Sequence, residues 1–214
     1  MPSTLDDRKS ELREAVRARR RSRTPDERDS VAARLAVQVG AIPAIAALVA
    51  APGSGCVALY ASFGTEPGTA RLRALFELSG VRVLLPVIRP DGGLDWAWDT
   101  GAVGAGAVSP GVPEPTGPVA GHGMAGLVEL GCTVVLAPAL AVDMSGNRIG
   151  KAGGYYDRLF GELDGVDPAR RPLLVAVVHD DDVVDEVPTG PHDRRVDAIL
   201  TPSRYLDLHP RRFA

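Results

Sequence analysis

The feature that most restricts the fold is a series of short apolar runs, rich in Val or Leu, separated by segments with helical spacing. Gly, Pro or Asp bounds each run, which is typical of buried strands in a mainly parallel sheet. The expected strands cover residues 56–60, 81–88, 133–142, 173–178 and 198–200. Helical segments between them are expected at residues 69–79, 124–130 and 155–163. This alternation predicts an α/β fold with helices on both faces of the sheet.

The N-terminal part of the chain is expected to be helical. Residues 5–22 predict a basic helix with a thin apolar stripe. Thr24 and Glu27 have the spacing of a capping box, so a second helix begins there and runs towards Leu48. The chain of 214 residues suits one domain over 1–214, in which residues 1–50 pack as helices on the α/β core.

The segment after the second expected strand has a different composition. Residues 94–98 fit an added antiparallel strand. Residues 99–123 are rich in Gly, Pro and Ala, so they are expected to form a long loop that is mobile or part of a site.

Composition and charge narrow the class of protein. The net charge of −3 argues against a dedicated nucleic-acid binder, so the basic stretch 17–23 is interpreted as solvated charge. No apolar run reaches the roughly 20 residues that cross a bilayer, and the N-terminus lacks an apolar signal core. Cys56 and Cys132 adjoin apolar runs and are expected to be buried free thiols. We expect a cytoplasmic monomer or weak dimer that binds small molecules, not nucleic acid or membrane.

The segment from Asn147 to Asp157 is the strongest candidate site. It follows an expected strand, holds several glycines and places the cations Arg148 and Lys151 beside them. Backbone N–H groups of such a loop approach anions closely, and the carboxyl ends of strands are the usual ligand edge in this fold class. The alternative is a glycine-rich turn with two solvated cations. A Walker A loop is excluded, because the spacing is one residue short and Ala152 stands where Ser or Thr would meet Mg²⁺.

The order of residues in this segment resembles a known family. Arg148-Ile-Gly-Lys-Ala-Gly-Gly-Tyr-Tyr-Asp-Arg158 resembles the Arg-Leu-Gly-Arg-Gly-x-Gly-Tyr-Tyr-Asp signature of 5-formyltetrahydrofolate cyclo-ligases, also called methenyltetrahydrofolate synthetases. Four further blocks resemble the family in the same order, at residues 9–13, 60–69, 111–115 and 187–201.

The resemblance implies both an activity and a fold. The family couples ATP hydrolysis to ring closure of 5-formyltetrahydrofolate, giving 5,10-methenyltetrahydrofolate, ADP and phosphate. The implied fold is a Rossmann-like three-layer sandwich similar to the ribose-5-phosphate isomerase and CoA-transferase group, which agrees with the α/β pattern.

Site residues follow from the same resemblance. It implies that Arg148, Lys151 and Tyr155 act in catalysis and that Asp157 and Asp193 hold Mg²⁺. The ATP-binding residues it implies are Lys9, Arg13, Arg148, Ile149, Gly150, Lys151, Ala152, Gly153, Gly154, Tyr155 and Tyr156. Without the resemblance, Lys9 and Arg13 would be interpreted as solvated charges on one helix face.

The folate site is expected to include Glu66, Ala61, Trp96 and Tyr156. The resemblance implies that Glu66 accepts hydrogen bonds from the pterin ring, since a carboxylate suits paired N–H donors. Trp96 and Trp98 either wall the folate pocket or pack in the core. Of Tyr155 and Tyr156, one is expected to stack on a ring and the other to pack on the sheet.

One residue departs from the family pattern. Ala152 stands where the family usually has glycine, and its methyl group strains the backbone if φ is positive there. The alternative is therefore a non-catalytic or attenuated member that binds folate or nucleotide. A sugar-phosphate isomerase or acyl-CoA transferase is less favoured, because no convincing carboxylate nucleophile is present and fold alone does not establish function.

Overall fold

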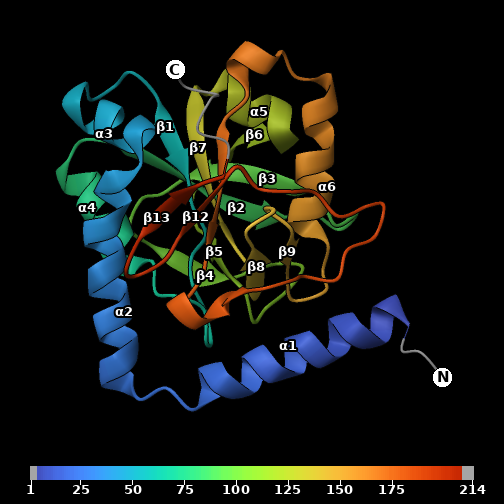
Figure 1. Cartoon of the computed structure of the whole chain (residues 1–214). Helices are drawn as coiled ribbons and strands as arrows, with labels where there is room; N and C mark the ends of the chain where they lie inside the picture. Colours follow the sequence, from blue (N-terminus) through green and yellow to red (C-terminus); the bar gives the residue numbers. More distant parts are fainter. Residues whose placement is uncertain (1–3, 209–214) are drawn as a thin grey trace.

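The computed structural model describes residues 4–208, and a sheet of order β13-β12-β10-β7-β1-β2-β3-β6 forms its centre (Figure 1). Its strands are β1 (Cys56–Ala58), β2 (Arg82–Ile88), β3 (Leu94–Trp98), β6 (Val119–His122), β7 (Cys132–Pro138), β10 (Leu173–Val177), β12 (Ala198–Leu200) and β13 (Tyr205–Asp207). The inner strands β12, β10, β7, β1 and β2 run parallel, whereas β3, β6 and β13 add antiparallel edges. The predicted, mainly parallel sheet is confirmed.

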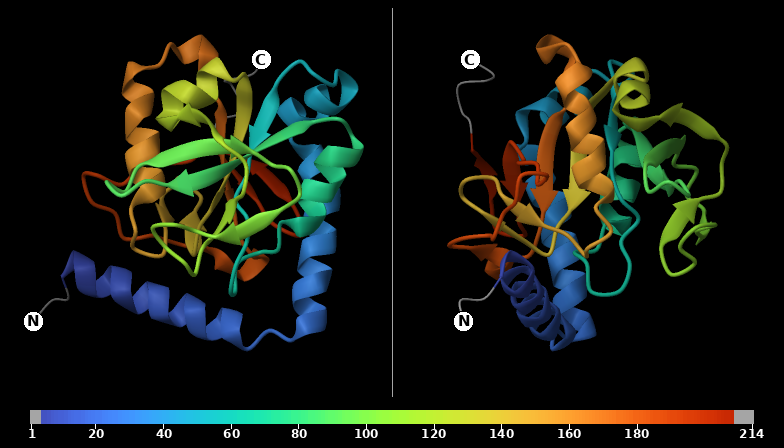
Figure 2. Two further views of the ribbon diagram at one scale, coloured as in Figure 1. Left: turned by 180° about the vertical axis from the view of Figure 1, so that it is seen from behind. Right: turned by 90° about the vertical axis from the view of Figure 1, so that its right-hand side faces the viewer.

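Helices cover both faces of this sheet. The helices are α2 (Pro25–Gln38), α3 (Pro43–Ala50) and α4 (Ala70–Leu78) on one face, and α5 (Gly123–Glu129) and α6 (Tyr155–Gly161) on the other. In Figure 1, α2 and α4 stand on the left of the sheet and α6 on the right, and the rear view in Figure 2 shows the same arrangement. The predicted three-layer architecture is therefore confirmed.

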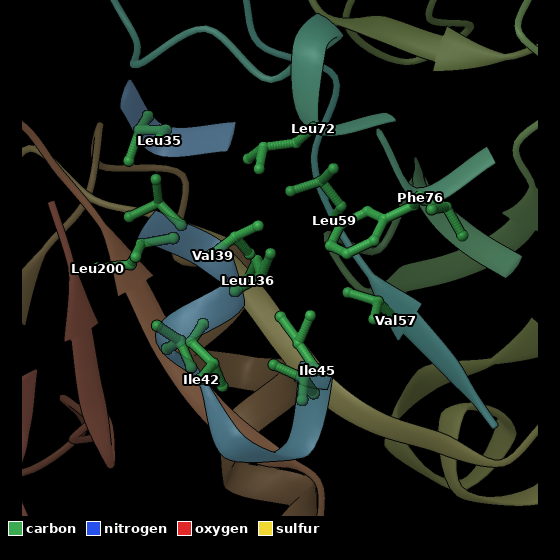
Figure 3. Close-up of a cluster of buried hydrophobic side chains, with 14 of the residues drawn as sticks. Leu35, Val39, Ile42, Ile45, Val57, Leu59, Leu72, Phe76, Leu136 and Leu200 are labelled. Atoms are coloured by element: carbon green, nitrogen blue, oxygen red, sulfur yellow. The ribbon is translucent and has the colours of Figure 1, made fainter. Parts of the chain in front are cut away.

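The two cores arise from strand alternation. In β1, Val57 points to the α2–α3–α4 side and Ala58 to the α5–α6 side. Figure 3 shows the first cluster, in which the helix residues Ile42, Ile45 and Phe76 pack with strand residues such as Val57. Because both faces are buried, the strands have continuous apolar sequences.

The second helix is shorter than expected. It ends at Gln38, a 3₁₀ turn (Val39–Ala41) follows, and α3 starts at Pro43. Pro43 disfavours helical backbone at Ile42, which has φ −79° and ψ 113°. The two helices meet at an angle of 82°, and within residues 4–208 no single helix is long and apolar enough to cross a membrane.

Residues 99–123 are also more ordered than a loop. They contain β4 (Val103–Ala105) and β5 (Pro113–Pro115), paired as an antiparallel ribbon, before β6 begins. The buried carboxylate of Glu114 accepts a hydrogen bond from the Ile88 backbone N–H at 2.9 Å and so ties the ribbon to β2.

Helix α1 (Leu5–Arg21) lies across the end of the sheet where the parallel strands finish (Figure 1). There it meets a small sheet of β11 (Val183–Val184), β8 (Ala141–Asp143) and β9 (Arg148–Ile149). Its Val16 is fully buried among Leu140, Ile149 and Val187. The first helix therefore covers the edge at which ligands bind in sheets of this class.

Candidate functional site

The buried carboxylate of Asp143 organises the β8–β9 hairpin that leads into the glycine-rich segment. Its Oδ1 accepts hydrogen bonds from the backbone N–H groups of Ser145 (2.9 Å) and Asn147 (3.0 Å). Its Oδ2 accepts from the Asn147 side-chain amide (2.9 Å) and the Val187 backbone N–H (3.0 Å). These bonds replace the water that the carboxylate loses on burial. The hairpin thereby holds Arg148, the first residue of β9, in a defined place.

The glycine loop after β9 turns sharply into α6. Gly154 precedes the helix with φ +66°, and Ala152 has φ +91°. Among residues 4–208, Ala152 is the only non-glycine residue with positive φ. Left-handed backbone costs alanine roughly 1–2 kcal/mol. Because φ is positive at Ala152, its methyl group strains the backbone of the loop, as the sequence led us to expect.

Helix α1 contacts the backbone of this loop. Arg13 donates from Nε to the Gly150 carbonyl oxygen at 3.1 Å, and Arg17 donates from Nη2 to the Lys151 carbonyl oxygen at 3.3 Å. With Lys9, these cations are spaced four apart and so share one helix face. That face is turned to the loop, not to solvent alone.

A cavity of about 500 Å³ lies between α1, the glycine loop and residues 191–194. We call it the basic cavity, because its lining includes the cationic side chains Lys9, Arg13, Arg148, Arg158 and Arg194. Two carboxylates, Asp157 and Asp193, also line it. The excess of cations suits a polyanion such as a phosphate chain.

Both carboxylates of the basic cavity are paired with cations. Asp157 Oδ1 lies 2.9 Å from Arg148 Nη2, and Asp193 Oδ2 lies 2.6 Å from Lys9 Nζ. Burial acts to raise the pKa of Asp193, but hydrogen bonds from Lys9 and the Gly190 N–H outweigh it and lower the pKa. Within residues 4–208, no group of three His, Cys, Asp or Glu residues forms a protein-only metal site.

Arg148 is nearly inaccessible to solvent, with 4% of the residue exposed. Burial lowers the pKa of its guanidinium, and the Asp157 carboxylate opposes that effect. Its Cζ lies 4.8 Å from the centre of the Phe160 ring, and its Nε has no hydrogen-bond partner. Arg148 is therefore a buried, firmly held cation in the wall of the basic cavity.

A second cavity of about 310 Å³ also borders the glycine loop. We call it the apolar cavity, since its walls include Ala61, Phe63, Ile88, Val112 and Leu140. The ribbon segment of residues 109–113 forms part of the wall, so residues 99–123 belong to the site as expected. A flat, mostly apolar ring system fits such a space.

Glu66 is the buried acid of the apolar cavity, with 4% of its side chain exposed. Its Oε1 lies 2.8 Å from Lys151 Nζ, and its Oε2 accepts a hydrogen bond from the Phe63 N–H at 3.0 Å. The Lys151 ammonium also lies 3.5 Å from the centre of the Phe63 ring. The buried hydroxyl of Tyr156, in the same cavity, has no hydrogen-bond partner. Burial raises the pKa of this phenol, so it remains a donor at neutral pH.

The two cavities share a wall. Arg148, Gly150, Gly154 and Asp157 line both of them. A group in the apolar cavity and an anion in the basic cavity can therefore meet at the glycine loop.

The match to known proteins covers nearly the whole chain. The model of the 5-formyltetrahydrofolate cyclo-ligase family matches residues 6–202. The chain belongs to this family. A 5-formyltetrahydrofolate cyclo-ligase of Mycolicibacterium smegmatis is 40% identical over 153 residues, which are 69% of this chain and 74% of the relative. The enzyme class predicted from the sequence is thus confirmed.

Solved structures agree with the cyclo-ligase assignment. The Aquifex aeolicus 5,10-methenyltetrahydrofolate synthetase superposes with a TM-score of 0.71 at 26% identity, covering 94% of this chain and 92% of that one. A 5,10-methenyltetrahydrofolate synthetase from Mycoplasma pneumoniae has a TM-score of 0.65 at 16% identity, covering 90% and 97%. The second likeness concerns the fold alone.

The residues that the cyclo-ligase resemblance assigned to ATP divide between the two cavities. Those on the basic cavity are Lys9, Arg13, Arg148, Ile149, Gly150, Ala152 and Gly154. Gly150, Gly154 and Arg148 also line the apolar cavity, together with Lys151, Gly153, Tyr155 and Tyr156. Ala61 and Glu66, assigned to folate, line the apolar cavity as well.

Trp96 lines neither of the two cavities, contrary to the expectation that it walls a ligand pocket. It is fully buried in the α5–α6 core, where its indole N–H donates to the Gly123 carbonyl oxygen at 3.0 Å. Trp98 packs under Arg82, whose Cζ lies 4.2 Å from the ring centre, and lines a different cavity. For both tryptophans, the packing role that was left open is the one observed.

The interpretation of residues 17–23 as solvated charge is wrong for Arg20. Its guanidinium is buried and pairs with Asp182, whose side chain has no solvent exposure. Arg23 pairs with Asp181 in the same cluster. The three consecutive aspartates at 180–182, after an expected strand, were the signal available in the sequence of this cyclo-ligase family member.

Proposed function

We propose that the protein uses ATP and Mg²⁺ to cyclise 5-formyltetrahydrofolate to 5,10-methenyltetrahydrofolate, with release of ADP and phosphate. The formyl oxygen attacks the γ-phosphorus, and ADP departs. N10 then attacks the activated formyl carbon and loses its proton. The C–O bond breaks, the former formyl oxygen leaves in phosphate, and the five-membered ring closes.

The observation that carries this proposal is the shared wall of the two cavities. The reaction joins an anionic phosphate chain to an amide of a flat ring system, so one site has to be cationic and its neighbour mainly apolar. Catalysis then rests chiefly on alignment and on neutralising charge. The basic and apolar cavities, which share the glycine loop as a wall, meet these needs.

In the basic cavity, Lys9, Arg13 and Arg148 bind the phosphate oxygens, together with N–H groups of the loop. Asp157 and Asp193 suit Mg²⁺, which commonly takes one or two carboxylates and completes its shell with phosphate oxygens and water. When bound, the ion neutralises phosphate charge. Asp157 and Asp193 would hold the ion, and in this structure they pair with Arg148 and Lys9.

In the apolar cavity, Glu66 accepts hydrogen bonds from the pterin N–H donors, and Ala61 and Tyr156 lie beside the ring. Lys151 occupies one oxygen of Glu66, so pterin binding frees its ammonium. The released cation, which lies next to the shared-wall residue Gly150 in the chain, is then available to the γ-phosphate. Tyr155 supplies an aromatic surface at the same junction.

A second candidate is an attenuated member that binds folate and nucleotide but turns over slowly. The observation that favours it is the positive φ of Ala152, on the rim of the basic cavity. A strained loop presents its N–H groups less accurately to phosphate.

The direct test mixes purified protein with 5-formyltetrahydrofolate, ATP and Mg²⁺, and follows methenyl product by absorbance. We expect one ADP per methenyl product, and no product when ATP or Mg²⁺ is omitted. Absence of product at high enzyme concentration would reject the cyclo-ligase proposal. Binding of both ligands without turnover would instead support the second candidate.

A substitution tests the assignment of Glu66. Glu66→Gln keeps the shape but removes the charge that pairs with donors, so KM for folate should rise about 10-fold to 100-fold while KM for ATP changes little. The control is Glu129→Gln at the exposed end of α5. Equal folate KM values for the two variants would exclude Glu66 from the folate site.

A further inference from the structure

The buried guanidinium of Arg20 joins three parts of the molecule. Its Nε donates to Asp182 Oδ2 at 2.8 Å, and its Nη2 donates to the carbonyl oxygens of Ala139 (2.7 Å) and Leu140 (3.1 Å). Arg19 donates to the other oxygen of Asp182 at 2.6 Å. Arg20 therefore fastens α1 to the end of β7 and to the turn after β10.

These partners bear directly on the apolar cavity. Ala139 and Leu140 are wall residues of that cavity. Their carbonyl oxygens accept hydrogen bonds from Arg20, which does not itself line the cavity, so the guanidinium supports the wall from outside the cavity. A planar guanidinium can bind a carboxylate and two carbonyls at once, which a lysine ammonium cannot do in the same geometry.

The other end of the same helix serves the basic cavity. Lys9 and Arg13 reach that cavity from α1, yet Val16 and Arg20 are the only buried residues of the helix. The remaining contacts of α1 with the core are the partly buried Leu12 and polar contacts at its surface, so Arg20 is the buried polar anchor of the helix. A helix that rotates or lifts at Arg20 carries Lys9 and Arg13 out of reach of a phosphate chain.

We propose that Arg20 is a positioning residue for both substrate cavities, setting α1 over the basic cavity and the β7 end along the apolar cavity. This inference rests on the proposed function, because it assumes that the cavities bind ATP and folate. It assigns to one buried side chain, which touches neither ligand, an effect on both affinities.

The experiment compares Arg20→Met, Arg20→Lys and the double variant Arg20→Met with Asp182→Asn. The double variant also removes the buried charge that Arg20→Met leaves with one partner fewer, so it separates positioning from instability. The matched control is Arg23→Met, which loses the pairing with Asp181 but no cavity-wall contact. Each protein is titrated with ATP–Mg²⁺ and with 5-formyltetrahydrofolate by calorimetry, and kcat and both KM values are measured.

We expect both dissociation constants to rise about 10-fold to 100-fold in Arg20→Met, since small displacements of binding groups have effects of this size. The double variant should unfold at a higher temperature than Arg20→Met and still bind both ligands weakly, because the carbonyl contacts stay lost. Arg20→Lys should recover only part of the affinity. Arg23→Met should resemble the unsubstituted protein.

Two outcomes would overturn the proposal. One is unchanged affinity for both ligands in Arg20→Met. The other is full recovery of affinity in the double variant, which would show that Arg20 acts through stability alone. If the unsubstituted protein binds neither ligand and makes no product, the proposed function itself fails, and that result is separate from either outcome.

Discussion

Ala152 holds a backbone angle that glycine adopts more easily than alanine. Its φ of +91° lies in the left-handed region, in the loop that forms the wall between the two cavities. Such strain persists where the surrounding contacts determine the backbone, and Arg13 and Arg17 bind the carbonyl oxygens of Gly150 and Lys151, the two residues that precede Ala152.

We therefore expect Ala152→Gly to stabilise the protein. Relief of strain exceeds the extra unfolded-state entropy of glycine, so the free energy of unfolding should rise by about 0.5–1 kcal/mol. Urea unfolding measures this change, and ATP titration should show tighter binding. As a control, Ala46→Gly in the exposed middle of α3 should lower the free energy of unfolding by a similar amount. A loss of stability in Ala152→Gly would show that alanine is unstrained here.

His179 is a buried base beside the Arg20 cluster. Burial lowers its pKa to about 4, and the Arg20 and Arg23 cations add to this effect, while Asp182 opposes it. Its Nδ1 has no hydrogen-bond partner, so the surroundings disfavour the protonated imidazolium and the ring stays neutral.

Stability should consequently fall in acid. Between pH 6.5 and about 4 the unfolded chain binds a proton at His179 that the folded protein does not. The free energy of unfolding therefore decreases as pH falls through this window, by a total of roughly 3 kcal/mol. Urea unfolding at several pH values should give a flatter profile for His179→Asn than for the unsubstituted protein. His192→Asn, at an exposed position, should keep the original slope, and equal slopes for all three proteins would contradict the assignment.

At the scale of elements, the β8–β9 hairpin is specified by one carboxylate more than by its strands. The strands pair over only a few residues, whereas Asp143 accepts hydrogen bonds from Ser145, Asn147 and Val187. The hairpin also fixes the position of Arg148, so a well-ordered hairpin gives a well-ordered site.

Asp143→Ala should thus destabilise the protein by about 3 kcal/mol, because several buried N–H groups lose their acceptor. Chemical denaturation measures the loss, and ATP affinity should fall with it. Asp91→Ala provides the comparison, since Asp91 also accepts a turn N–H, from Gly93, but is exposed. Its cost should stay below about 1 kcal/mol. Similar costs for the two substitutions would mean that the β8–β9 hairpin does not depend on its carboxylate.

The sequence predicts some elements of this fold but not others. The parallel strands and the glycine loop were predictable, because each depends on local composition and spacing. The ribbon at 99–123 was not, since its pairing and its tie through Glu114 to Ile88 are non-local. Trp96 and Trp98 lie two residues apart and so share one face of β3, but the pairing of β3 with β2 and β6 determines that this face is buried.

On the scale of the whole molecule, α1 is bound differently from the other long segments. The central strands are buried on both faces, whereas α1 is held by Val16, the Arg20 anchor and ion pairs. Sequence alone suggested solvated cations there, because their partners Asp182 and Asp193 lie more than 150 residues away.

This difference predicts that α1 opens without global unfolding. In native-state hydrogen exchange, amides of α1 should exchange at a lower free energy than those of β7 and β10. Saturating ATP–Mg²⁺ should slow exchange in α1 more than in α4, which contacts neither cavity. Exchange of α1 together with β7, at one common free energy, would show that the helix belongs to the cooperative core.

The shared wall of the two cavities has a consequence for inhibitor design. Since Arg148, Gly150, Gly154 and Asp157 face both spaces, one molecule that joins a pterin-like ring to a phosphate-like anion can occupy both. The second half then binds at an effective concentration set by the linker, in the millimolar range for a short flexible one. A compact linker passing over the glycines would therefore gain avidity without any new protein contact.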